Sequence, residues 1–332
     1  MAETKHFCGR PAGGSIAAMR SRTFLLVSLI ALVFASLLPA AEKPPLFALH
    51  EVGKGVWAAI SPNGSKAGAN AGFVIGDNGV AVIDSFQNVD AARELLAEIR
   101  QKTSLPIHYL VNTHYHLDHM TGNGVFAEAG ALILANENVR AWAHTENLKF
   151  FGPHPTAADR ARVDAIALPG VTYNNGIDIY LGNRQIIVRQ MPGHTGSDSI
   201  VVVPDANVVF TGDLFWDAHL PNVIDASTKP WIETLNALAA KYPAATFVPG
   251  HGEVGHLKDL EAFRAYLLFL REHVAAGLKE GKSGDALVAA LQPEFQREYG
   301  SWGFFKFFLK PNILLTAAEL QGKKRLPGGK VD

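Results

Sequence analysis

The chain has 332 residues, of which 48% are hydrophobic and 18% are charged. These proportions are typical of a globular protein, and the length favours one large domain with an appendage over two equal halves. The formal net charge is -1, and no block of like charges runs along the chain. Because nucleic-acid binding demands a basic footprint, we expect no nucleic-acid partner.

Residues 1–41 have the layout of a secretory signal peptide and are not expected to be part of the fold. A short basic stretch begins at Met19, the apolar run Phe24–Leu38 follows, and small residues at Ala40 and Ala41 suit a signal peptidase. Met19 is the expected start, since residues 1–18 would make an unusually long leading segment. The apolar run is short for a membrane span. We therefore expect export to the periplasm or the medium, without stable membrane association after cleavage; an uncleaved anchor is the alternative.

The only cysteine, Cys8, lies in this leading segment. A mature chain without cysteine suits an oxidising compartment. It also excludes disulfides, thiolate metal ligands and a cysteine nucleophile.

Apolar β-rich runs separated by turn signals, and apolar residues at helical spacing, predict the following elements in the first half. They are strands at Gly55–Ile60, Gly72–Ile75 and Val80–Ile83, a helix at Asn88–Lys102, strands at Ile107–Val111 and Leu132–Ala135, a helix at Asn136–Asn147, and a surface excursion at Gly152–Gly170.

In the second half the same criteria predict strands at Gln185–Met191, Ile200–Val203 and Val208–Thr211, a helix at Lys229–Lys241, a strand at Thr246–Val248, and helical structure from Leu257 to near Leu320. Strands and helices in this order indicate two sheets packed face to face with helices outside.

The segment from His114 to His119 is the most specific motif of the chain. His114 and His116 are two residues apart, so in extended backbone both side chains point to one side and can hold one ion. After the chain turns, Asp118 and His119 can address a second ion nearby.

Three further candidate ligands follow predicted strands in loops of small residues. They are His194 in Pro-Gly-His-Thr-Gly, Asp213 in Thr-Gly-Asp, and His251 in Pro-Gly-His-Gly. Strand ends on a rigid scaffold are places where side chains can converge on a metal. A lone loop histidine is more often a packing or surface residue, but the dense motif upstream favours ligands.

The motif His-x-His-x-Asp-His, followed by His, Asp and His at strand ends, resembles the metallo-β-lactamase superfamily. The resemblance covers residues 47–256 and implies an α/β fold, a four-layer αββα sandwich with metals at one edge. The helical pattern from Leu257 onward predicts a C-terminal helical extension over residues 257–332. The resemblance also implies that His114, His116 and His194 hold a first metal, that Asp118, His119 and His251 hold a second, and that Asp213 bridges the two.

Imidazole and carboxylate ligands suit two zinc ions per chain, although iron or manganese would accept the same ligand types. The resemblance implies a zinc-dependent hydrolase in which a metal-bridging hydroxide, oriented by Asp118, attacks a small-molecule ester, lactone or β-lactam. A thioesterase like glyoxalase II and an acyl-homoserine lactonase are alternatives. An iron-dependent oxidoreductase of the same fold is the alternative from another class.

Four features near the motifs have two interpretations each. Asp84 either fixes the metal-binding loop or belongs to an ordinary turn. Tyr115 and Trp216 either line the substrate pocket or pack in the core. The aromatic run Trp302–Leu309 is either a helix packed on the sandwich or an exposed surface, which would be an apolar wall of the active site or a dimer contact.

Overall fold

The computed structural model describes residues 45–329. The expected signal peptide at residues 1–41, including Met19, therefore lies outside the described residues. From Leu46 onward the chain forms one compact unit, so the expected extension at residues 257–332 belongs to the same unit as the sandwich. Among the described helices, none is both long and apolar enough to cross a membrane.

The first sheet has seven strands in sequence order. They are β1 (Ala48–Gly53), β2 (Val56–Ile60), β3 (Ala71–Ile75), β4 (Val80–Ile83), β5 (Ile107–Val111), β6 (Leu132–Asn136) and β7 (Val171–Tyr173). Strands β1 to β4 pair antiparallel, whereas β4 to β7 pair parallel. The carboxyl ends of β4, β5 and β6 therefore lie at one edge of the sheet.

The second sheet has five strands in the order β12-β11-β10-β9-β8. They are β8 (Gly176–Leu181), β9 (Arg184–Gln190), β10 (Ser199–Val203), β11 (Val208–Trp216) and β12 (Thr246–His251). Only β11 and β12 pair parallel within it, so their carboxyl ends also share an edge.

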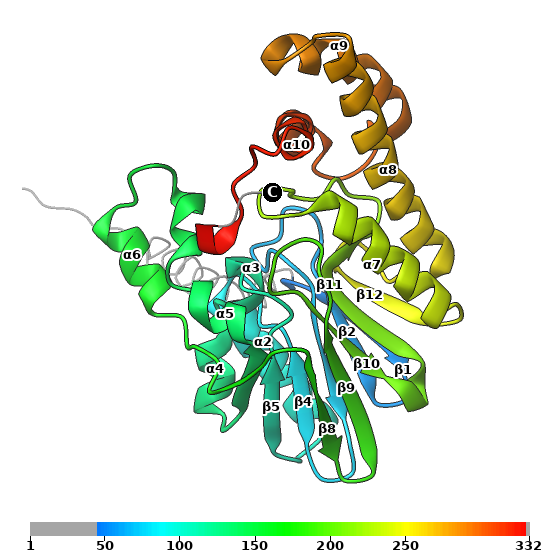
Figure 1. Ribbon diagram of the computed structural model, residues 1–332. Helices are drawn as coiled ribbons and strands as arrows, with labels where there is room; N and C mark the ends of the chain where they lie inside the picture. Colours follow the sequence, from blue (N-terminus) through cyan, green and yellow to red (C-terminus); the bar gives the residue numbers. More distant parts are fainter. Residues whose placement is uncertain (1–44, 330–332) are drawn as a thin grey trace, which may run out of the picture. The chain divides into compact units, whose positions relative to one another are not determined.

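The two sheets pack face to face with helices on the outside (Figure 1). Apolar side chains such as Val74, Val111 and Phe210 fill the space between the sheets. Helices α2 (Val89–Lys102) and α4 (Asn123–Glu128) cover the first sheet, while α7 (Thr228–Lys241) and α8 (Leu257–Lys279) cover the second. These four layers confirm the predicted αββα sandwich.

Several element boundaries differ from the prediction. Strands β1, β7 and β8 were not expected, and the predicted surface excursion contains α6 (Ala157–Asp164), which begins at a capping box formed by Thr156 and Asp159. The helix expected at residues 136–147 is the shorter α5 (Glu137–Trp142), followed by a 3-10 segment, η1 (Glu146–Phe151).

The predicted C-terminal helical region is present as three helices. They are α8, α9 (Gly284–Tyr299) and α10 (Phe305–Leu320). The break before α10 lies at Phe304, whose φ of 58° is in the left-handed region that a bulky residue rarely adopts. In Figure 1, α10 lies beyond the edge of the sheets, away from the outer faces that α2 and α8 cover.

Candidate metal centre

The histidine motif begins directly after β5. His114 follows the strand by three residues, His116 precedes the short helix α3 (Leu117–Met120), and Asp118 and His119 lie within α3. The turn from strand to helix redirects the chain, so the four side chains address a common volume. All four histidine and aspartate side chains are buried except that of Asp118, which is 26% exposed.

The remaining three candidate residues come from the second sheet. His194 lies in the loop between β9 and β10, Asp213 lies within β11, and His251 ends β12. Strand β11 continues past the expected end at Thr211 to Trp216, and its register with β12 shifts around Gly212, which has a φ of 50°. Glycine adopts this conformation without steric cost. A Cβ at Gly250 would collide with the Asp213 carboxylate, so this glycine leaves room for the side chain, whereas Gly212 leaves room for Thr113.

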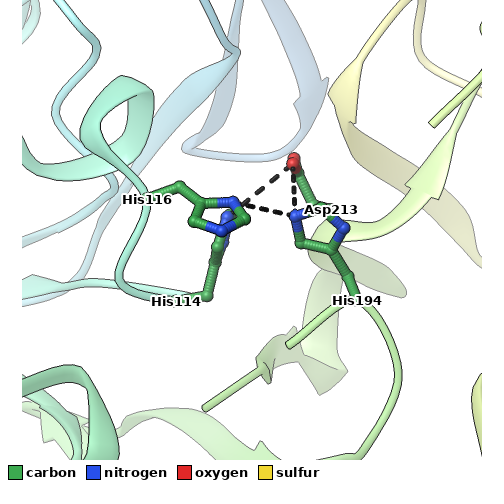
Figure 2. A group of neighbouring side chains, drawn as sticks. All are labelled: His114, His116, His194 and Asp213. Atoms are coloured by element: carbon green, nitrogen blue, oxygen red, sulfur yellow. Dashed lines mark hydrogen bonds and ion pairs between the residues drawn. The ribbon is translucent and has the colours of Figure 1, made fainter. Parts of the chain in front are cut away.

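The structure brings all seven residues together in two groups whose ligand atoms lie within 4.8 Å of one another. The first group is His114, His116, His194 and Asp213 (Figure 2), and the second is Asp118, His119 and His251.

The Asp213 carboxylate lies between the two groups. Its Oδ2 is 3.2 Å from His194 Nε2 and 3.7 Å from His114 Nε2, whereas its Oδ1 is 3.0 Å from His119 Nε2 and 3.5 Å from His251 Nε2. Each carboxylate oxygen therefore faces a different group of ligands, which is the arrangement that a bridging ligand requires.

The chemistry of the buried atoms fits metal ions in both groups. The Nε2 atoms of His114, His119 and His251 and the Oδ1 atom of Asp213 have no hydrogen-bond partner among the described residues. Buried polar atoms are normally hydrogen-bonded, so such a cluster needs an explanation, and a cation supplies one. The first group offers four imidazole or carboxylate donors, and the second offers three together with the shared Asp213. Both sets suit zinc.

Asp84 orients His119 of the second group by accepting a hydrogen bond from the ring nitrogen that does not face Asp213. Its Oδ2 accepts hydrogen bonds from His119 Nδ1 at 2.8 Å and from the Thr113 hydroxyl at 2.7 Å, and its Oδ1 accepts from the Thr113 amide. Asp84 also has a φ of 55°, a strained conformation that the surrounding contacts must hold. Of the two interpretations of Asp84, the geometry supports the fixing of the metal-binding loop.

Asp225 fixes the first group in the same way, although no sequence motif marks it. Its Oδ2 accepts a hydrogen bond from His116 Nε2 at 3.0 Å, which leaves His116 Nδ1 facing His194 Nε2 at 2.9 Å. The hydroxyl of Tyr115 also donates to Asp225, and the Lys149 ammonium lies 2.6 Å from its Oδ1. Although burial alone would raise the pKa of Asp225, His116 and Lys149 hold it below its usual range.

We expect the Asp225→Ala variant to bind metal at the first group about 10- to 100-fold more weakly, the usual cost of removing a carboxylate that orients a ligating histidine. Competition with a chromogenic chelator measures the affinity. Tyr115→Phe is the matched control, because it removes one donor to Asp225 and leaves the bond to His116 intact. Equal metal affinities in Asp225→Ala and the unaltered chain would contradict the orienting role.

Tyr115 and Trp216 have different roles. Tyr115 is fully buried and donates to Asp225, so it packs in the core and does not line the pocket. Trp216 is also buried, yet it borders the cavity beside the metal cluster and stacks on the His251 ring with centroids 3.9 Å apart. Its Nε1 donates to the Asp213 carbonyl at 3.0 Å. Trp216 therefore helps to hold Asp213 and His251 in place and also lines the cavity.

A cavity of about 680 Å³ opens beside the two groups. Its polar lining residues are four members of the metal cluster, His116, Asp118, Asp213 and His251, together with Ser65, Gln87 and Asn222. Its apolar lining residues are Leu117, Phe150, Trp216, Ile224, Phe304, Phe307, Phe308, Pro311 and Leu315. The volume is in the range of pockets that bind small molecules.

Comparison with known families agrees with the fold and the cluster. The sequence model of the metallo-beta-lactamase superfamily matches residues 65–251, which is more than half of the chain and spans all seven residues. The chain belongs to this superfamily.

Two curated relatives show how varied its members are. The metallo-beta-lactamase type 2 of Bacteroides fragilis is 26% identical over 62% of this chain and 74% of its own length. A hydroxyacylglutathione hydrolase of Mesorhizobium japonicum is 27% identical over 49% of this chain, and the match spans only 56% of that enzyme.

A solved metallo-beta-lactamase from Pontibacter korlensis has the same fold. It superposes with a TM-score of 0.57 at 24% identity, over 67% of this chain and 99% of its own. A third of this chain therefore has no counterpart in that structure. Helix α10 lies outside the segment that the superfamily model matches.

Proposed function

We propose that this protein is an exported dizinc hydrolase that cleaves a small-molecule ester, lactone or β-lactam at the seven-residue cluster. The observation that supports it most is the position of Asp213, with one oxygen facing each group of ligands. Membership of a superfamily that includes β-lactamases gives independent support for hydrolysis. Export rests on residues 19–41, which lie outside the described part of the chain.

Two zinc ions bound there would lower the pKa of a shared water toward about 7 and polarise the scissile carbonyl. In the overall reaction water adds to the carbonyl carbon, the bond from that carbon to the leaving oxygen or nitrogen breaks, and the proton from water ends on the leaving atom. This balance needs no oxidant and no covalent protein intermediate.

The chain's own residues position these participants. Although burial alone would raise the pKa of Asp118, His119 and His251 lower it to about 2, so the carboxylate is ionised and can accept a hydrogen bond from water in the cavity. Asp84 and Asp225 hold His119 and His116 in fixed tautomers. Trp216 covers the His251 ring and excludes solvent from that side.

Hydrolysis of a thioester is a second candidate, supported by the relative named hydroxyacylglutathione hydrolase. Glutathione carries two carboxylates, and cationic side chains would favour its binding. No lysine or arginine is among the described residues that line the main cavity. An ester, lactone or lactam therefore fits this site better.

Metal analysis by plasma mass spectrometry on the zinc-loaded protein is expected to give about two zinc ions per chain. A panel of nitrocefin, acyl-homoserine lactones, nitrophenyl esters and S-lactoylglutathione tests the reaction. Activity should disappear with a chelator and return with zinc. An activity that iron restores and zinc does not would instead support the iron-dependent oxidoreductase alternative. A metal content near zero after loading would contradict both the zinc hydrolase and the iron oxidoreductase.

A further inference from the structure

Helix α10 has two apolar faces, of which one is buried and the other is only partly covered. Phe305, Leu309 and Ile313 pack into the core that α8 shares. The other face consists of Phe307, Phe308, Pro311 and Leu315, at the spacing of one side of a helix, and it is extended by Phe304, which directly precedes the helix. All five residues line the cavity. A helix that is apolar on both sides is normally buried on both sides.

The uncovered face ends in exposed aromatic rings at the mouth of the cavity. Phe307 is 71% exposed, and Phe150, which lines the same cavity from the η1 segment, is 38% exposed. Exposed apolar groups of this size that line one pocket indicate a surface that a ligand covers.

Phe304 connects this wall with the metal cluster. Its backbone is held at a φ of 58°, and its ring contacts His251 with centroids 5.9 Å apart and Trp216 with centroids 6.0 Å apart. Strained non-glycine residues concentrate at functional sites. The apolar wall thus begins beside a candidate metal ligand and continues outward along α10.

Among the described residues that line the cavity, no lysine or arginine stands outside the metal cluster to bind a polyanionic occupant. The only ionised side chains that the lining contributes besides its histidines are Asp118 and Asp213, both in the metal cluster. Arg162 lies in a separate, smaller cavity of about 140 Å³, which shares Gln87, Leu117 and Phe150 with the main one.

We infer that the cavity takes the uncharged hydrocarbon chain of an acyl ester, with the ester carbonyl at the metal cluster and the chain along α10. This inference rests on the proposed hydrolytic function and names its substrate class. Because α10 lies beyond residues 65–251, the selectivity comes from a part of the chain outside the superfamily match. Burial of each methylene against this wall should increase transition-state binding.

A series of nitrophenyl esters with acyl chains of two to ten carbons tests the inference on the zinc-loaded, full-length protein. We expect kcat/KM to rise about two- to fourfold per methylene while the chain stays within the cavity. The Phe307→Ser variant should flatten this slope. Phe307 is mostly exposed, so the variant should keep its fold, which circular dichroism checks.

Leu268→Ser is the matched control, since Leu268 is 47% exposed on α8 and does not line the cavity. Arg162→Ala is a second control for the small adjoining cavity. Both should keep the slope of the unaltered chain. A flat slope in the unaltered chain, or the same slope in Phe307→Ser and Leu268→Ser, would overturn the inference.

Calorimetric binding of n-alkanols of four to ten carbons, which cannot be hydrolysed, separates this inference from the proposed function. Affinity that rises with chain length, less steeply in Phe307→Ser, supports the apolar cavity even when no ester is cleaved, and then only the hydrolytic function fails. Ester cleavage without chain-length dependence and without alkanol binding leaves the hydrolase standing and overturns the acyl-chain assignment.

Discussion

The Asp213→Ala variant is expected to bind its second metal ion more than about 100-fold more weakly, since even residues behind a metal ligand cost 10- to 100-fold when removed. The physical reason is the position of the carboxylate, with Oδ1 3.0 Å from His119 Nε2 and Oδ2 3.2 Å from His194 Nε2. Without this charge, two cations a few ångströms apart would repel each other with no anion between them. The rate of ester hydrolysis should fall by at least the same factor as the occupancy of the second metal site.

Metal content after dialysis, and chelator competition, measure this effect. Asp213→Asn keeps the shape and removes the charge, so it separates electrostatics from packing, and we expect it to resemble Asp213→Ala. Asp90→Ala is the control, because Asp90 is an exposed aspartate in the first turn of α2. Full occupancy of both sites in Asp213→Ala would refute the bridging role.

The metal cluster was predictable from sequence because its residues sit at places with strong local signals. His114 and His116 are two residues apart, so in extended backbone their side chains point to the same side. Asp213 and His251 stand next to glycines. Gly212 and Gly250 are needed where they stand, since a Cβ at either would collide with Thr113 or Asp213. Local sequence thus reflects the steric demands of the site directly.

The residues behind the cluster lacked such signals. Asp225 lies in an irregular loop and contacts His116 across 109 positions of sequence, and Lys149 comes from a 3-10 segment that apolar spacing did not mark. Their contacts with the metal cluster depend on the tertiary packing of loops, which secondary-structure propensity does not encode. Tyr115 was ambiguous for the same reason, because only its hydrogen bond to Asp225 shows that it points into the core.

The unexpected strands share a different cause. The β1 segment is largely exposed and lacks clear apolar alternation, and β8 is an edge strand with exposed positions at Asp178 and Tyr180. Edge strands gain their pairing from a neighbour and bury little of their own surface. The aromatic run Trp302–Leu309 was predicted to pack in the core, to form an active-site wall or to make a dimer contact. Phe305 and Leu309 pack in the core, whereas Phe307 and Phe308 line the cavity.

The two groups of ligands should respond differently to pH. Burial, followed by the charge of His119, lowers the pKa of His114 well below its usual range, and burial also lowers the pKa of His116. Burial opposes protonation of His251 as well, but Asp213 and Asp118 raise its pKa to about 9, and Asp213 and Asp84 raise that of His119 well above the usual value.

A metal ligand must be deprotonated, so bound protons compete with the ion. The lowered pKa values of His114 and His116 favour their neutral, metal-binding forms, whereas the raised pKa values of His251 and His119 favour protons that the second metal must displace. In His194→Ala, where the second group remains, metal affinity should fall about tenfold per pH unit for each proton displaced as the pH decreases from 8 to 6. In His251→Ala, where the first group remains, the decrease should be less steep, because burial lowers the pKa of His114 and of His116. Chelator competition at pH 6, 7 and 8 measures both, and equal slopes in the two variants would show that the carboxylates do not distinguish the groups in this way.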